Sequence, residues 1–491
     1  MVNSYKTDGD TKFGVILSKT VILILAVFSI YLLYLNFWCS VQYNALIYAI
    51  IVIPVFAVIF LIAYKMNISP LAFAITILVL AFLSKGIFAA LVDTQPVSDF
   101  NTFYQCAIKL INGDKSFGHT FYFKSWAYQT GPIIYYSAIM KFFGTGLLPL
   151  KLVNCFFMAG TNAFIYLIAR KVSNDYTARF VALLYLIYPA PYFLTSVLTN
   201  QHFAACMFLA AIYILFIEKL NFILKVLLAG VLLSVGNAVR PLGLVIIIAL
   251  VMWGIVELIR HKKVAKIGMV VLLVGIYLLV NFGIATMVKR TDVNPEGLSN
   301  NYPLWKFVIG FNNDSKGQFS YEDQDKIFYI QDSTQRNNVS MQVIKERLSI
   351  GLPKLASLIN IKQRIMWAEL DTLRWEFYQK IDDKMILPQG FEKIEFGILR
   401  IEKVYYLLVF ILMILGLCRV FLNKRVKPEV LLLSMLLLCY FGVHILIEVQ
   451  TRYRYFAVIL MFVLAAKGSE LLFNNFKTYR ENTVDNTNFS E

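Results

Sequence analysis

Long apolar runs, separated by short polar segments, repeat along most of this chain. Runs of about 18 to 22 apolar residues are long enough to cross a bilayer as single helices, and we count about twelve of them. Their predicted bounds are 17–38, 44–64, 70–92, 148–169, 178–197, 201–217, 222–239, 241–259, 267–288, 402–422, 429–448 and 454–472. The pattern therefore predicts an all-α polytopic membrane protein.

Basic residues collect in alternate short loops between these runs. Examples are the segments "RHKK" at 260–263 and "NKRVK" at 423–427, which fall on the same side when the spans alternate. Lys and Arg concentrate in cytoplasmic loops of membrane proteins. We therefore predict that both chain termini are cytoplasmic and that two long segments, 93–147 and 289–400, lie outside.

One apolar stretch in the first long segment is too short to be counted as a span. The sequence "GPIIYYSAIMKFFG", residues 131–144, has the length of an interfacial or buried helix. Counting it as a span would also move "RHKK" and "NKRVK" outside. We place it on the outer surface, and we expect the amphipathic sequence "PKLASLINIKQRIMWAEL" of the second long segment to lie on the membrane there.

This reading divides the chain into five parts. Residues 1–69 hold a cytoplasmic segment and two extra spans, and 70–288 form a transmembrane core with the outer loop 93–147. Residues 289–400 form a small extracytoplasmic region, 401–472 the C-terminal spans and 473–491 a cytoplasmic tail. The first apolar run is interpreted as a retained span because no small-residue cleavage site follows it.

Composition supports the membrane assignment and argues against several other classes of protein. The chain is 59% hydrophobic and 15% charged, so a soluble globular fold could not bury its apolar surface. The net charge of +16 follows from the loop lysines and arginines, so it does not imply nucleic acid. Six cysteines without a CxxC pair predict neither a disulfide framework nor a zinc site.

The segment "PVSDFNTFYQCAIKLINGD", residues 96–114, carries an acid where the chain leaves the third run. Apolar residues follow at helical spacing, among them Phe100 and Tyr104, which predicts an amphipathic helix capped by Ser98. Asp99 then lies in the first turn, where an alternative role is to complement the helix dipole. Asp93 is a second carboxylate of this loop, with a helix terminator as its alternative role.

Several basic residues lie outside the loops that we predict to be cytoplasmic. Arg240 in "GNAVRPLGL" and Arg452 and Arg454 in "EVQTRYRYF" fall on the outer side. A guanidinium fork suits phosphate, although contact with lipid headgroups is the alternative. Lys85 lies within the third span, where a charge marks a functional site unless its side chain reaches the interface.

Two histidines and a group of aromatics also lie near the outer ends of the spans. His202 and His444 have side chains that can bond a phosphate or hydroxyl or act as a general base, although each alone is also explained as a structural histidine. The aromatics could stack on sugar rings or form an interfacial belt. Taken together, outer carboxylates and cations are what a reaction on a lipid-borne phosphate needs.

The order of several motifs resembles one enzyme superfamily. The segments "PVSDFNTFYQCAIKLINGD", "YQTGPIIYYSAIMKFFGTGLLPLKLVN", "AVRPLGL" and "TRYRYFAVILMFVLAAKG" resemble the membrane-embedded GT-C glycosyltransferases. Within this superfamily, the chain resembles the bacterial relatives of protein O-mannosyltransferase and aminoarabinose transferase, which is a likeness to glycosyltransferase family 39. It covers residues 70 to 472, preceded here by two extra spans, and Ser-Asp stands where many relatives have Asp-Glu.

This resemblance implies a GT-C fold and a glycosyltransferase that uses a polyprenyl-phosphate-linked sugar as donor. The acceptor would be an envelope glycan, teichoic acid, lipid or protein, and the enzyme would act at the outer face of a bacterial plasma membrane. Asp99 matches the position of the catalytic base. The donor-phosphate candidates are Arg240, Arg452, Arg454 and Lys85, and the candidates for contact with acceptor or phosphate are Asp93, His202 and Tyr104.

No cofactor is expected beyond the lipid-linked substrate. Arginine can supply the positive charge, so a metal is not demanded, and a divalent metal is left open. Two other classes stay open at this point. A lipid-linked glycan transporter or flippase would use discontinuous helices near mid-bilayer, and an envelope-polymer polymerase or ligase would use the large outer segment 289–400.

Overall fold

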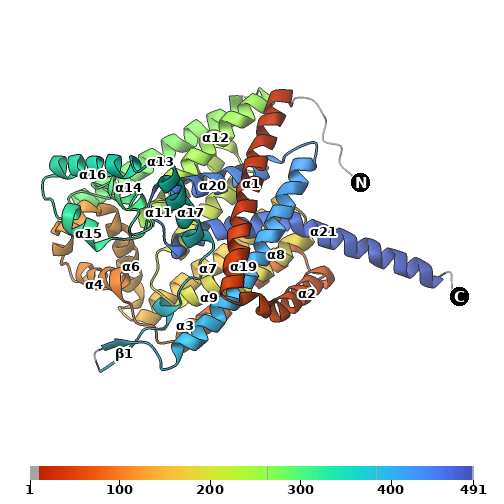
Figure 1. Ribbon diagram of the computed structural model, residues 1–491, viewed down its shortest axis with the longest axis horizontal. Coiled ribbons are helices and arrows are strands. Elements are labelled where there is room, and N and C mark those ends of the chain that lie inside the picture. The colour runs from red at the N-terminus through yellow and green to blue at the C-terminus, as the bar shows by residue number, and fades with distance from the viewer. Residues whose placement is uncertain (1–9, 263, 383, 489–491) are drawn as a thin grey trace.

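Long apolar helices form the body of the protein (Figure 1), and ten of them lie within the described residues. The computed structural model describes residues 10–262, 264–382 and 384–488. Within these ranges, the helices able to cross a membrane are Lys12–Gln42 (α1), Ala45–Lys65 (η1, Ala45–Tyr48, with α2, Ala49–Lys65), Pro70–Leu91 (α3), Leu147–Val172 (α7), Phe222–Val239 (α11), Gly243–His261 (α12), Val264–Arg290 (α13), Phe391–Leu422 (α19), Pro428–Leu446 (α20) and Thr451–Thr478 (η6, Thr451–Arg454, with most of α21, Tyr455–Asn488). The predicted all-α polytopic membrane fold is confirmed.

Two of the predicted spans differ in shape from a single straight helix of span length. The run 178–197 is broken into Asp175–Ile187 (α8) and Pro189–Ser196 (α9, Pro189–Phe193, with η4, Leu194–Ser196), bent by 55°. Proline disfavours helical geometry in the residue before it, and Tyr188 is extended there, with ψ of 122°. The run 201–217 is a helix of 15 residues, Gln201–Leu215 (α10), which is short for a span.

The best-buried helix of the bundle is α21, and it packs closely on α19. The two backbones meet at glycines, because a Cβ on Gly468 would lie 1.8 Å from the Leu412 carbonyl oxygen. Small residues at such crossings allow membrane helices to approach. Helices α2, α3 and α13 lie at the periphery and expose large apolar side chains such as Ile50, Leu71 and Phe282, as lipid-facing helices do.

The two long connecting segments lie side by side at the left of Figure 1. Backbone bonds join them, from the Tyr128 amide to the Ser299 carbonyl (3.1 Å) and from the Asn301 amide to the Ser125 carbonyl (3.0 Å). Their elements are α4 (Ser98–Ile111), η2 (Ser116–His119), α5 (Phe121–Ser125), η3 (Ala127–Gln129), α6 (Thr130–Phe143), α14 (Trp305–Gly310), α15 (Tyr321–Asp323), η5 (Gln324–Phe328), α16 (Ser333–Leu348), α17 (Leu352–Trp367), α18 (Arg374–Phe377), β1 (Gln379–Ile381) and β2 (Lys384–Ile386). Strands β1 and β2 pair as a short antiparallel hairpin.

Helix α4 confirms the amphipathic helix predicted at residues 98–111, with one correction at its start. The N-cap is Val97 rather than Ser98, and Ser98 has a positive φ of 54°. The helix ends at Ile111, Asn112 is its C-cap, and Gly113 follows with φ of 85°. Its buried face packs on α6, which confirms that the stretch 131–144 is a short helix and not a long span.

Ion pairs gather the short basic loops at one end of the bundle. Asp10 pairs with Arg260 (3.3 Å) and with Arg425 (3.5 Å), and Glu470 pairs with Arg419 (3.2 Å). The loops after α12 and α19 and the start of α1 therefore meet. Which side of the membrane this end faces, and the five-part division of the chain, stay predictions.

Candidate active site

Asp99 stands in the first turn of α4 with a free carboxylate. The helix is held by its buried face, where Phe100 packs edge-on against Trp375 with ring centroids 6.0 Å apart. In the part of the chain that the structure describes, no hydrogen bond or ion pair engages the half-buried Asp99 side chain. The carboxylate lines two adjoining cavities, so it is available to a ligand in either.

The larger of these cavities, the wide cleft, has a volume of about 800 Å³, within the range of small-ligand sites. Its lining combines aromatic side chains from both long segments with polar residues of η6 and the loop before it. The lining residues used below are Asp99, Trp126, Trp305, Lys306, Asp371, Thr372, Trp375, Glu448, Thr451 and Arg452.

The second space, the arginine cavity, has a volume of about 230 Å³ and is lined by Asp99, Arg240, Lys306, His444 and Arg452. Arg240 follows the end of α11 and donates to the Asn200 side-chain oxygen (3.0 Å). Arg452 on η6 donates to the Gln450 side-chain oxygen (2.7 Å). Across residues 10–262, 264–382 and 384–488, no carboxylate pairs with either guanidinium, so both charges are open to an anion.

The lysine of the arginine cavity is already neutralised. Lys306, at the start of α14, forms an ion pair with Glu448, and Glu448 is buried. Burial by itself would raise the pKa of Glu448, but the adjacent Lys306 holds that pKa below its ordinary value. The pair therefore contributes little net charge, and Arg240 and Arg452 remain the unbalanced cations beside Asp99.

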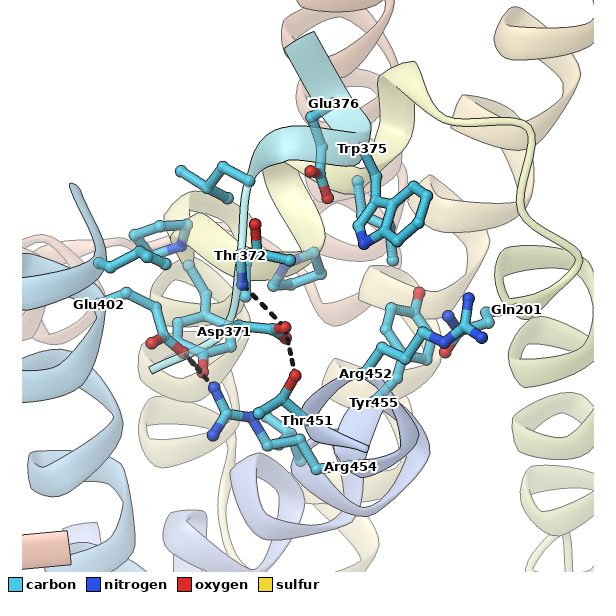
Figure 2. A pocket seen from close by; sticks show the side chains of 18 of the residues that line it. Gln201, Asp371, Thr372, Trp375, Glu376, Glu402, Thr451, Arg452, Arg454 and Tyr455 are labelled. Carbon is cyan, nitrogen blue, oxygen red and sulfur yellow. Dashed lines mark hydrogen bonds and ion pairs between the residues drawn. The ribbon is translucent and has the colours of Figure 1, made fainter. Parts of the chain in front are cut away.

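Figure 2 shows a third space, the loop pocket, which lies beneath residues 371–376. Asp371 accepts from the Thr451 hydroxyl (2.5 Å) and from the Thr372 amide (3.0 Å). Glu376 points into the pocket from above. The break between α8 and α9 and the start of α21 complete the walls, through Tyr185, Tyr188, Pro189, Leu194, Tyr455 and Val458.

The three spaces are connected at Arg452, which lines all of them. The loop pocket and the wide cleft also share the residues Asp371, Thr372, Trp375 and Thr451. A ligand in the arginine cavity would therefore lie in a space that Asp99 lines and that shares Arg452 with the loop pocket. Among the described residues, no group of three or more His, Cys, Asp or Glu is placed to hold a metal ion.

The predicted base and two of the predicted phosphate ligands come together here. Asp99, Arg240 and Arg452 line one cavity although they come from three distant segments. Arg454 reaches the loop pocket, but it is buried, pairs with Glu402 (3.7 Å) and donates to the Glu369 carbonyl (3.1 Å). Its charge is therefore already balanced within the protein.

His444 also lines the arginine cavity, with its Nδ1 atom 2.8 Å from the Tyr440 carbonyl oxygen. The candidates Lys85, His202, Tyr104 and Asp93 do not line these spaces. Lys85 is buried in α3, where its ammonium donates to the Leu186 carbonyl (3.1 Å) and lies 5.3 Å from the Tyr192 ring centre. His202 is also buried, and its two ring nitrogens face the Tyr455 hydroxyl (2.8 Å) and the Leu194 carbonyl (3.2 Å).

The last two candidates lie in the first long segment. Tyr104 donates to the Thr145 carbonyl (2.8 Å), and the exposed Asp93 accepts from the Gln95 side chain (2.9 Å). The substrate contacts proposed for Asp93, Tyr104, Lys85 and His202 stay predictions.

Sequence reasoning missed four charged residues of the site, namely Lys306, Asp371, Glu376 and Glu448. Each stands alone in a loop or short helix, without a spacing that marks chemistry. One signal was present for Lys306 and Glu448, since opposite charges in two loops beside aromatics can pair. Only the folded chain brings position 306 to position 448.

Searches against protein-family models and curated proteins find no match to this chain. Among solved structures, the chain is similar to an oligosaccharyltransferase from Archaeoglobus fulgidus tethered with an acceptor peptide, with 14% identity, a TM-score of 0.47 and coverage of 83% of this chain and 50% of that one. It is also similar to the oligosaccharyltransferase AglB from Archaeoglobus fulgidus in complex with an inhibitory peptide and a dolichol-phosphate (15% identity, TM-score 0.41, 84% and 52%).

A further similarity is to ArnT from Cupriavidus metallidurans bound to undecaprenyl phosphate, with 14% identity, a TM-score of 0.31 and coverage of 82% of this chain and 77% of that one. The chain spans about half the length of the archaeal oligosaccharyltransferases it matches. With TM-scores below 0.5, these similarities assign neither a substrate nor a site residue to this chain.

Proposed function

We propose that this protein is a membrane glycosyltransferase of the GT-C type that transfers a sugar from a polyprenyl-phosphate carrier to a cell-envelope acceptor. One observation carries the proposal. The unpartnered carboxylate of Asp99 shares a cavity with the guanidinium groups of Arg240 and Arg452, which no described carboxylate neutralises. A base beside an anion site is the arrangement that glycosyl transfer from a phosphate requires.

The reaction follows from these three side chains. Asp99 accepts the proton of an acceptor hydroxyl, and the resulting oxygen attacks the anomeric carbon of the donor sugar. A bond forms between that oxygen and the anomeric carbon while the bond from the carbon to the phosphate oxygen breaks. The electron pair leaves with the polyprenyl phosphate, whose charge Arg240 and Arg452 stabilise.

The position of the arginine cavity supports a lipid-borne anion over a soluble one. Arg240 follows the end of α11, and Tyr440 lies in the last two turns of α20, so the ends of membrane helices line the cavity. The adjoining apolar space, with a volume of about 10 Å³, is too small for an isoprenoid chain. We therefore expect the chain of a polyprenyl phosphate bound at Arg240 to extend into the surrounding bilayer.

We place the site at the outer face of the plasma membrane. The wide cleft belongs to the two long segments, whereas the basic loops gather around Asp10, Arg260 and Arg425. The positive-inside rule assigns those loops to the cytoplasm. The wide cleft then opens to the envelope and is the entry for the acceptor.

Replacement of Asp99 by Asn tests the proposal, because the amide keeps the shape of the side chain and cannot take the proton. The measurement is release of polyprenyl phosphate from a polyprenyl-phosphate sugar by the purified protein with an envelope fraction as acceptor. Loss of a general base lowers the rate by about 100-fold or more. Asp325→Asn, an exposed acid of the second long segment, serves as the control and should keep the full rate.

Unchanged transfer by Asp99→Asn refutes the role of Asp99 as base. Movement of the lipid-linked sugar across vesicle membranes without bond cleavage would identify a flippase instead. Lengthening of the envelope polymer itself, rather than addition of a side group, would identify a polymerase or ligase.

A further inference from the structure

Glu376 has the least satisfied carboxyl group of the loop pocket. The residue is 3% exposed, and its Oε2 atom has no hydrogen-bond partner among the described residues. Burial, with smaller contributions from the charges of Asp371 and Glu395, raises the pKa of the Glu376 carboxyl well above its ordinary value. The neutral carboxyl can both donate and accept a hydrogen bond.

The backbone around Glu376 is fixed, so the direction of this carboxyl is part of the fold. The Glu376 carbonyl accepts from the hydroxyls of Thr94 and Ser196, and the Tyr378 carbonyl accepts from the Gln95 amide (2.8 Å). Figure 2 shows the side chain directed into the loop pocket between Thr372 and Trp375. A buried polar group that is held toward a cavity without a partner indicates that a ligand supplies the partner.

We propose that the loop pocket holds the transferred sugar, and that it selects an uncharged sugar whose hydroxyl groups hydrogen-bond to Glu376 and Asp371. This inference rests on the proposed function, because it places the sugar next to the phosphate at Arg452. The connection at Arg452 then puts the anomeric carbon between the loop pocket and Asp99.

The lining chemistry favours a sugar over the isoprenoid chain. Trp375, Pro189 and Leu194 offer apolar surfaces to the ring, while Gln201 and Thr451 add polar groups. Sites with mostly apolar walls and a few placed polar groups are typical for small polar ligands. An isoprenoid chain in the same place would leave the Glu376 carboxyl without a partner.

The charges of the loop pocket also exclude an acidic sugar. Arg454 is balanced by Glu402, and Arg452 faces the phosphate, so no free cation remains for a second anionic group. Asp371 would repel a sugar carboxylate, and the neutral Glu376 carboxyl offers it no positive charge. Uronic acids are therefore expected to bind poorly.

Binding measurements on the purified full chain in lipid nanodiscs test this inference. The probes are undecaprenyl phosphate, undecaprenyl-phosphate glucose, undecaprenyl-phosphate mannose and undecaprenyl-phosphate glucuronate. We expect at least one neutral sugar to tighten binding by about tenfold relative to undecaprenyl phosphate, as one well-made buried hydrogen bond can do. The glucuronate should give no such gain.

Two variants of Glu376 test whether its carboxyl group forms the hydrogen bond to the sugar. Glu376→Leu removes an unpaired buried polar group, so it should fold, and it should bind undecaprenyl phosphate as the wild type does while losing the gain from the sugar. Glu376→Gln keeps a donor and an acceptor and should retain most of the gain. Glu392→Gln, on the exposed first turn of α19, is the matched control and should change nothing.

Three results would overturn the inference: no gain from either neutral sugar, an equal gain from glucuronate, or a gain that survives Glu376→Leu. Tighter binding of undecaprenyl phosphate itself by Glu376→Leu would place the isoprenoid chain in the loop pocket instead. If undecaprenyl phosphate fails to bind the wild type at all, the proposed function falls first, independently of Glu376.

Discussion

At the scale of single residues, the partners of a charged side chain decide whether it can meet a substrate. Arg452 and Arg454 are two positions apart and have the same side chain. Arg454 is buried against Glu402, whereas Arg452 is half-buried and contacts only the neutral Gln450 side chain among the polar groups described. Breaking a buried ion pair leaves an uncompensated charge, so Arg454 stabilises the fold, whereas the Arg452 guanidinium remains available to a ligand.

Replacing Arg452 by Gln should weaken binding of undecaprenyl phosphate by about 10- to 100-fold, since a hydrogen bond to a charged group is worth about 1.5 to 3 kcal/mol. The same binding measurement on Arg290→Gln gives the control, because Arg290 is an exposed base at the end of α13. Equal losses in both variants would mean that general surface charge, and not a site at Arg452, attracts the lipid.

At the scale of elements, short irregular pieces between the long helices build the site. The break before Pro189, the turn η6 and the loop ahead of α18 each carry lining residues of the loop pocket. Helix α21 holds η6 in place through its crossing with α19. Here a Cβ on Gly416 would lie 2.7 Å from the Gly468 nitrogen, so the two helices touch through their backbones.

Gly468→Ala should therefore destabilise the protein, because its added methyl meets the Leu412 carbonyl oxygen. Overpacking of this kind costs about 1 to 3 kcal/mol, and the melting temperature in detergent measures it. Gly442→Ala in α20 is the matched control, since no atom lies within 4 Å of its added methyl. An equal melting temperature for Gly468→Ala and the wild type would contradict the close crossing.

At the scale of the whole molecule, the cavities and the basic loops lie in different parts of the fold. The cavities open among the two long segments, and the basic loops meet around Asp10 and Glu470. Under the proposed function, a donor with an apolar tail would reach the arginine cavity from the bilayer, and a polar acceptor would enter from the aqueous side.

Labelling of single introduced cysteines tests this arrangement in intact cells. A maleimide that cannot cross membranes should label Asp325→Cys in the second long segment and leave Lys424→Cys, between α19 and α20, unlabelled until the cells are opened. The native cysteines form a low background because four are buried and two half-buried. The reverse labelling pattern would place the site in the cytoplasm and refute its outer location.

The sequence by itself determined the class of protein, most spans and the position of α4. Apolar length and helical periodicity are local properties, so they can be recognised without knowledge of the fold. The same applies to α6 and to the lone Asp99 in the first turn of α4. Local rules missed the 55° bend within 178–197, where Pro189 interrupts the apolar run, and they were wrong at Ser98, which is not the cap.

Only the tertiary structure decided which charges are free. Arg240 and Arg454 look alike in sequence, and a Glu402 more than fifty positions earlier in the chain neutralises one of them. Lys306 is likewise neutralised by Glu448, and Lys85 is enclosed among helices. Pairing of charges depends on distances between remote segments, and those distances exist only after the helices pack. The loop pocket with Glu376 arises in the same way, from pieces that no pattern along the chain connects.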